Sequence, residues 1–143
     1  MLKGINPLLG PDLLHILRAM GHGDEIAIVD GNYPAATDAR RLVRMEGHGV
    51  VTLVDAILSV MPLDHHVPAA FRPGIKGDPH HVEQIMQALA GAIARHDPAV
   101  RLEPLMGDAF YARVKGAFAL VASGERALYG NVILRKGVIG PEA

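Results

Sequence analysis

His22 lies between two glycines, in a short turn that we expect to join a helix to a strand. The glycines give the backbone freedom that would let the imidazole face a cleft, and histidine gives and takes protons near neutral pH. Asp30 follows the predicted strand 25–29 at its carboxyl end, where open α/β sheets usually place ligands. The spacing alone also fits an ordinary turn histidine and a turn aspartate, so both interpretations stay open.

A second polar segment, residues 124–131, connects two predicted strands and reads Gly-Glu-Arg-Ala-Leu-Tyr-Gly-Asn. It places a phenol (Tyr129), an amide (Asn131) and charged groups on one connection, a set of hydrogen-bonding groups that suits a polyol. Gly130 would let a ligand approach the backbone closely. The alternative is a hairpin turn with incidental polar residues.

Two pairs of adjacent histidines, 65–66 and 80–81, raise the question of a metal site. Neighbouring histidines point to opposite faces of a strand, and in a helix they diverge by about 100°. The i, i+4 spacing that zinc prefers on one helix does not occur in the sequence. We therefore expect loop or solvent-exposed histidines and no metal. The glycines around His22 precede a strand and lack a third glycine, so they are not a dinucleotide-binding fingerprint.

The composition excludes several classes of protein. The 143 residues are 50% hydrophobic and 20% charged, with a net charge of −1 and no cysteine. This charge balance argues against a nucleic-acid partner, and no disulfide or thiolate nucleophile can form. No apolar run approaches the roughly 18 residues of a membrane span, and no secretory signal is visible, so we expect a cytoplasmic protein. The mean hydropathy of +0.21 is high for a small protein and suggests association between copies.

Short strands alternate with helices along the chain. This order is typical of one α/β domain, spanning residues 1–143, with a central β-sheet flanked by helices. We predict helices at 11–20, 50–61, 79–95 and 108–115, and strands at 25–29, 42–45, 67–71, 100–102, 118–122 and 131–135.

Together, residues 21–26 with Asp30 and residues 124–131 resemble the RbsD/FucU family of sugar mutarotases, and its L-fucose mutarotase branch more closely. The likeness is loose only over about residues 37–106. The resemblance implies an α/β subunit in a ring-shaped homo-oligomer, decameric in known members, with active sites near subunit contacts. It implies neither a metal nor an organic cofactor. Further matches are Met1-Leu2-Lys3, Pro7-Leu8-Leu9, Phe110-Tyr111, Arg113 and Leu134-Arg135-Lys136-Gly137-Val138.

The resemblance also implies roles for individual residues. The family's catalytic histidine falls on His22, and its substrate-binding residues fall on Asp30, Tyr129, Gly130 and Asn131. Interconversion of α and β anomers needs a group that protonates the ring oxygen while the anomeric hydroxyl loses its proton. A histidine such as His22 suits this task.

One position departs from the family pattern. Where fucose-type members offer an arginine to the sugar, and ribose-type members a histidine, this chain has Gly107. Arg126 and His66 are candidates to replace the missing side chain, and the departure leaves the preferred monosaccharide open. A non-catalytic sugar-binding or regulatory protein of a sugar-uptake system is the alternative function.

Overall fold

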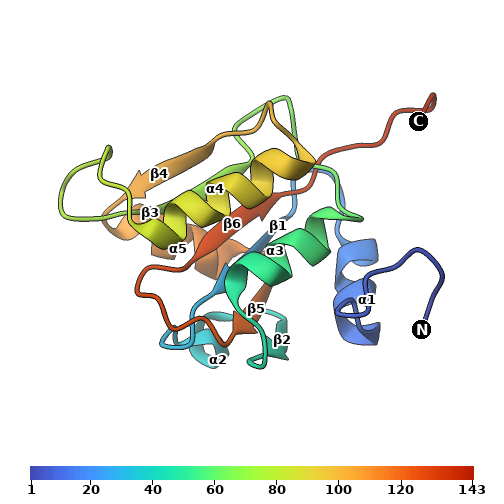
Figure 1. The fold of residues 1–143 in the computed structure, drawn as a ribbon, viewed down its shortest axis with the longest axis horizontal. Helices are drawn as coiled ribbons and strands as arrows, with labels where there is room; N and C mark the ends of the chain where they lie inside the picture. Colours follow the sequence, from blue (N-terminus) through green and yellow to red (C-terminus); the bar gives the residue numbers. More distant parts are fainter.

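A computed structural model describes all 143 residues and contains one six-stranded sheet with helices on both faces (Figure 1). This architecture confirms the predicted α/β class. The strands are β1 (Glu25–Val29), β2 (Leu42–Met45), β3 (Ala70–Gly74), β4 (Leu102–Met106), β5 (Ala119–Ser123) and β6 (Val132–Arg135). The helices are α1 (Pro11–Ala19), α2 (Ala35–Asp38), α3 (Val50–Leu58), α4 (Gln84–His96) and α5 (Asp108–Gly116).

The order of the strands across the sheet is β2-β5-β1-β6-β3-β4. Strand β6 is antiparallel to both of its neighbours, β1 and β3, while the other pairings are parallel. The carboxyl ends of β1 to β5 therefore share one edge of the sheet with the start of β6. The amino ends of those strands share the opposite edge with the end of β6.

The central strands bury both of their faces, as the apolar run of β1 requires. Ile26 and Ile28 pack into a large core with α1, α3 and α4. Ala27 and Val29 point the other way, into a smaller core that includes Phe110 of α5. Figure 1 shows α3 and α4 side by side over the sheet, with α5 behind it. The two cores hold the sheet edges, and the polar groups on them, in a fixed arrangement.

Two strands lie further along the chain than the sequence predicts. The predicted strands 67–71 and 100–102 are β3 and β4, which extend to Gly74 and Met106. The ends of these strands were not predicted because Pro73 and Pro104 lie in them, and proline is rare inside a sheet. Strand β3 pairs with β6 only through Ala70 and Phe71, and beyond them it pairs with β4 alone. Pro73 therefore lies where no second neighbour needs its missing N–H.

The third long helix begins later than predicted, at Gln84 and not at Pro79. The carboxylate of Asp78, directly before the predicted start of the helix, accepts a hydrogen bond from the His80 backbone N–H (2.9 Å) within a turn. The Pro79 carbonyl accepts one from the buried guanidinium of Arg72 (2.9 Å). These side-chain contacts hold residues 78–81 outside the helix. The four-residue helix α2 was not predicted, because one turn is too short to show a period.

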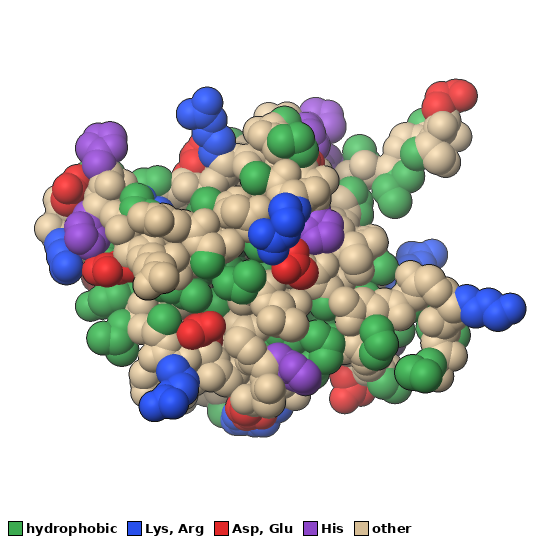
Figure 2. Space-filling view, viewed as in Figure 1, with side chains coloured by type: hydrophobic (Ala, Val, Ile, Leu, Met, Phe, Trp, Pro, Cys, Tyr) green, Lys and Arg blue, Asp and Glu red, His purple; other side chains and the backbone are tan.

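The surface carries mixed charge. Figure 2 shows basic, acidic and histidine side chains scattered over the visible face, with no large area of one sign. This distribution agrees with the net charge of −1. None of the helices combines the length and the apolarity that crossing a bilayer requires.

Candidate active site

Two polar residues that are far apart in the sequence meet at one edge of the sheet. Asp30 directly follows β1 and Asn131 directly precedes β6, and these two strands are antiparallel neighbours. The Asp30 backbone N–H donates to Asn131 Oδ1 (2.7 Å), and Asn131 Nδ2 donates to Asp30 Oδ2 (3.1 Å). Both residues are buried. The paired hydrogen bonds therefore fix the orientation of the carboxylate and of the amide.

Asp30 and Asn131 line an open hollow of about 470 Å³. A volume of this order lies within the range of small-molecule sites. Carboxylate, amide and phenol groups together offer donors and acceptors to several hydroxyl groups, so the hollow suits a polyol. Its remaining lining residues are Asn32, Tyr33, Pro34, Asp38, Tyr111, Lys115, Leu128 and Tyr129.

Two tyrosines stack on one wall of this hollow. The rings of Tyr33 and Tyr111 are 6.3 Å apart between centroids, and the Tyr33 hydroxyl donates to Asp38 Oδ2 (2.7 Å). Burial and the bond to Asp38 raise the pKa of Tyr33. Burial, with Tyr129 and Asp30 nearby, raises the pKa of Tyr111. Both phenols therefore remain protonated at neutral pH and can donate hydrogen bonds.

The loop that carries Tyr129 is stabilised by hydrogen bonds between its own residues. Glu125 Oε1 accepts from the backbone N–H groups of Arg126 and Ala127 (2.9 Å each). Tyr129 adopts a φ of +62°, a left-handed conformation that is uncommon for a residue with a side chain. At Gly130, an added Cβ would lie 2.7 Å from Glu125 Cγ. The loop's own packing therefore requires glycine at position 130, and the strained Tyr129 presents its phenol to the hollow.

A second polar cluster occupies the opposite edge of the sheet. His22 lies in the turn before β1, Asp64 and His66 lie ahead of β3, and Arg135 ends β6. Asp64 Oδ2 hydrogen-bonds His22 Nε2 (3.1 Å) and accepts from Arg135 Nε (2.9 Å). Asp64 Oδ1 accepts from the His66 backbone N–H (2.9 Å) and hydrogen-bonds His66 Nδ1 (3.1 Å). One buried carboxylate thus organises two histidines.

Asp64 also determines which nitrogen of His22 faces solvent. Hydrogen bonds from the His66 backbone N–H and from Arg135 hold the pKa of Asp64 far below its usual range, with smaller contributions from the two imidazoles. An ionised Asp64 places a proton on His22 Nε2 and leaves His22 Nδ1 free. The side chain of His22 is 44% exposed and that of Asp64 is 1% exposed. His22 is therefore an exposed imidazole whose orientation is fixed by the buried Asp64.

The same three side chains have the types that bind a divalent cation. Ligand atoms of His22, Asp64 and His66 all lie within 4.8 Å of one another. Arg135, however, donates to the same Asp64 oxygen that His22 contacts, and its positive charge would repel a cation there. The arrangement therefore favours proton transfer over metal binding.

The two clusters do not meet within one chain. His22 precedes β1 and Asp30 follows it, and five strand residues at about 3.3 Å each separate them by about 16 Å or more. The structure brings Asp30, Tyr129 and Asn131 to one hollow and places His22 at the other end of the strand. Asp64, and not Asp30, is the carboxylate beside His22 of the same chain.

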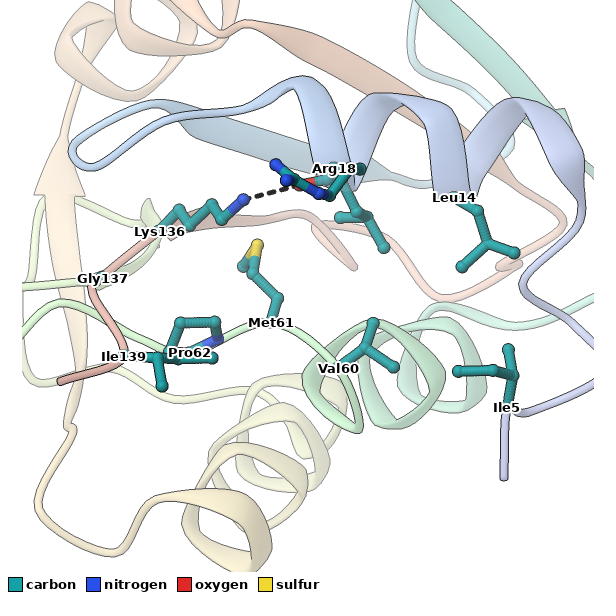
Figure 3. A pocket seen from close by; sticks show the side chains of 10 residues that line it. Ile5, Leu14, Arg18, Val60, Met61, Pro62, Lys136, Gly137 and Ile139 are labelled. Carbon is teal, nitrogen blue, oxygen red and sulfur yellow. Dashed lines mark hydrogen bonds between the residues drawn. The ribbon is translucent and has the colours of Figure 1, made fainter. Parts of the chain in front are cut away.

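A different hollow, of about 400 Å³, lies among α1, the segment after α3 and the end of the chain (Figure 3). Its walls are mostly apolar, and its charged side chains are the cations Arg18 and Lys136. Lys136 Nζ donates to the carbonyls of Leu17 and Met20 (2.7 and 2.6 Å), where α1 ends. Lys136 is therefore occupied in terminating a helix, and this hollow offers no acid–base pair.

The remaining sequence candidates lie elsewhere. His65 is exposed in a loop and contacts Asp97 (2.6 Å), as an ordinary loop histidine would. Gly107 joins β4 to α5 with a φ of +55°, at the same sheet edge as Asp30. Arg126 is exposed on the loop that carries Tyr129. Of the two suggested replacements for the side chain missing at Gly107, His66 is the one that lies beside His22, with 5.5 Å between ring centroids.

The profile of the RbsD / FucU transport protein family matches residues 3–139. The chain belongs to the RbsD/FucU family. An L-fucose mutarotase of Actinobacillus pleuropneumoniae is 38% identical over 140 residues, which cover 96% of this chain and 97% of that protein. A human fucose mutarotase is 42% identical over 145 residues, covering 96% of this chain and 94% of that protein.

A solved structure from the same RbsD/FucU family supports the fold. The fucose mutarotase of Streptococcus pneumoniae, in complex with L-fucose, superposes with a TM-score of 0.89 at 40% identity. The superposition covers 97% of this chain and all of that one. The α/β architecture predicted from the sequence is therefore that of a family member with a sugar bound.

Sequence reasoning missed one residue at each edge. Tyr33 lines the hollow and no local pattern indicates this position, whereas Tyr111, which also lines it, belongs to the Phe110-Tyr111 match with the family. Asp64 was missed because its partners, His22 and Arg135, are 42 and 71 residues away along the chain. The only local signal was the acid directly before two histidines at 65 and 66.

Proposed function

We propose that this chain, as a single domain of residues 1–143, is a sugar mutarotase that interconverts the α and β anomers of a monosaccharide, L-fucose or a related aldose. The names of the relatives support this substrate class. The observation that carries the reaction is the exposed His22 imidazole held on the buried, ionised Asp64. A group with this tautomer and exposure is suited to general acid–base catalysis.

In the proposed reaction, protonated His22 gives the proton on Nδ1 to the ring oxygen of the sugar. The bond between C1 and the ring oxygen breaks as the anomeric hydroxyl passes its proton to a nearby base or to water, and C1 becomes an aldehyde. C1 then rotates, and the ring closes on the other face with the proton transfers reversed. Asp64 hydrogen-bonds His22 Nε2 and so fixes the orientation of the ring. No redox centre or covalent intermediate is needed.

The substrate-binding residues in this proposal are Asp30, Tyr129, Gly130 and Asn131. Asp30 and Asn131, locked together, would hold neighbouring hydroxyl groups, and the Tyr129 phenol would close over the sugar. Gly130 contributes its backbone and keeps the loop in shape. Because Gly107 offers no side chain to the sugar, we expect the preference among aldoses to depend on the groups around it.

The separation of His22 from Asp30 leads us to propose a shared site. The His22 edge of one copy would face the Asp30 hollow of the next, so that each active site needs two copies of the chain. A contact between two different edges is heterologous, and such contacts close into rings when the rotation permits. We therefore propose a ring-shaped homo-oligomer. The family resemblance implies that the ring assembly is a decamer, and we propose that it acts in the cytoplasm on a free monosaccharide.

The experiment is saturation-transfer NMR on equilibrated L-fucose, D-ribose and D-galactose. We expect the wild-type chain to accelerate α/β exchange of at least one sugar, and His22→Ala to lower that rate by about 10²–10⁴-fold. His15→Ala, which removes an exposed histidine on α1, is the matched control and should leave the rate unchanged. Sugar binding by wild type without accelerated exchange would instead support the non-catalytic alternative.

A further inference from the structure

The second imidazole on Asp64 has no role in the proposed reaction so far. His66 has an exposed side chain, at 71%, and its Nδ1 is engaged with Asp64 Oδ1 at 3.1 Å. Its ring lies 5.5 Å from that of His22, tilted by 53°. Since Nδ1 is used, the free nitrogen of His66 is Nε2. The two free ring nitrogens, His22 Nδ1 and His66 Nε2, therefore belong to rings that lie close together.

We propose that His66 is a second acid–base residue of the site, and that it takes the proton of the anomeric hydroxyl while His22 protonates the ring oxygen. This inference rests on the proposed mutarotase function and deepens it. Ring opening needs an acid and a base in the same step. A pair of imidazoles that share one carboxylate can supply both when one ring is an imidazolium, which donates a proton, and the other is neutral, with one free nitrogen that accepts a proton.

Each proton that is transferred during ring opening is returned during ring closure. Before ring opening, His22 is an imidazolium and His66 is neutral. The ring oxygen takes a proton from His22, the bond between C1 and that oxygen breaks, and the O1 proton passes to His66 as the aldehyde forms. When the ring closes, His22 takes the proton back from the ring oxygen. His66 returns its proton to O1, directly or through one water molecule.

Asp64 suits this exchange because its two oxygens face the two rings separately. The single positive charge moves from the ring on Oδ2 to the ring on Oδ1, and remains beside the same carboxylate. The other charged groups facing the pair are Arg135 on Asp64 Oδ2 and, behind it, Glu25, which lies 3.6 Å from Arg135. Hydrogen bonds from the His66 backbone N–H and from Arg135 keep Asp64 ionised, so the carboxylate itself does not take up the proton.

His66 could also replace the side chain that the chain lacks at Gly107. A glycine cannot donate to a sugar hydroxyl beyond its backbone N–H. In a site shared between two copies, His66 of one copy and Gly107 of the next would flank the same sugar, since they lie at the His22 edge and the Asp30 edge respectively. The exposed imidazole would then supply a polar contact that Gly107 does not.

The test compares His66→Ala with His66→Gln and with His65→Ala, the adjacent exposed histidine that binds Asp97 and not Asp64. We expect H66A to slow anomer exchange at least tenfold at neutral pH and to flatten its pH dependence between about pH 5 and 8. Free imidazole should restore part of the H66A rate. H66Q, which keeps a hydrogen-bonding group but carries no titratable proton, should remain slow, and H65A should match wild type.

Several results would overturn the proposal. H66A with wild-type exchange across the pH range would do so, as would full activity in H66Q. Loss of activity on treatment with a chelator, restored by added Zn²⁺, would make the cluster a metal site instead. The proposed function fails separately, if wild type itself does not accelerate exchange. NMR of ¹⁵N-labelled histidines adds a readout besides activity: we expect protonated Nε2 in His22 and protonated Nδ1 in His66, and both to change in D64N.

Discussion

Asp64 is the residue on which the His22 cluster depends. Its two oxygens, almost completely buried, take hydrogen bonds from two imidazoles, a guanidinium and a backbone N–H. Such a carboxylate is stable only while it is ionised and all its partners are in place. Both the folded structure and the orientation of the two rings therefore depend on Asp64.

The first prediction concerns the pH dependence of stability. The pKa of Asp64 is lowered in the folded chain, so its stabilisation is present above the unfolded value of about 4 and is lost as the pH falls below that value. We expect Asp64→Asn to unfold at a lower temperature than wild type at neutral pH. The gap should narrow as the pH falls from about 5 to about 2, as measured by circular dichroism.

The control is Asp97→Asn, which removes a carboxylate that binds His65 and no arginine. Its thermal midpoint should change less than that of D64N at neutral pH. An equal loss in both variants, or a D64N gap that stays constant down to acid pH, would contradict the assigned role of Asp64.

The second prediction concerns the pair at the other edge. Asn131→Asp would place a second carboxylate about 3 Å from Asp30, and two buried like charges repel each other. The change also breaks the hydrogen bond from Asn131 Nδ2, so we expect a loss of about 1–3 kcal/mol in the free energy of unfolding at neutral pH. Denaturant titration should find that part of this loss is recovered as the pH is lowered, because protonation of one of the two carboxyls removes the repulsion. A pH-independent loss would contradict this account.

At the scale of elements, β6 joins the two polar clusters. Asn131 precedes it and Arg135 ends it, and it lies at the centre of the sheet between β1 and β3. Its side chains alternate between the two cores, with Leu134 in the larger and Ile133 in the smaller. A change in the packing of β6 therefore affects both edges at once.

The third prediction follows from that position. Leu134→Ala removes a fully buried side chain and should lower the free energy of unfolding by about 2–5 kcal/mol. Val138→Ala, four residues on and 56% exposed, is the matched control and should change it by less than about 0.5 kcal/mol. Chemical denaturation measures both. A small effect at Leu134 would mean that β6 is not the packed centre of the sheet.

The sequence predicted those elements whose burial pattern is local. The apolar run of β1 and the helical spacing of apolar residues in α1 were sufficient, because each depends on side chains that are close in sequence. Strands β3 and β4 were placed too early, since Pro73 and Pro104 are tolerated only through pairings that the sequence does not reveal. The predicted start of α4 was wrong because the buried guanidinium of Arg72 donates a hydrogen bond to the Pro79 carbonyl and holds this residue outside the helix.

At the scale of the whole molecule, the sequence predicted candidate residues but not their distribution. Asp30, Tyr129 and Asn131 line one hollow, as their places at the end of β1 and before the start of β6 allow. His22 lies at the far edge, and one chain does not complete a site that contains them all. The high mean hydropathy predicts association between copies, and the shared site that we propose requires such association.

The most direct test of the shared site mixes two inactive variants. His22→Ala and Asp30→Asn would be co-expressed, and anomer exchange measured by saturation-transfer NMR on the purified assembly. If each site takes His22 from one copy and Asp30 from the next, random mixing restores about a quarter of the wild-type sites. H22A mixed with D64N should stay inactive, because both changes damage the same half. Recovery absent from the first mixture, with the assembly intact, would contradict the shared site.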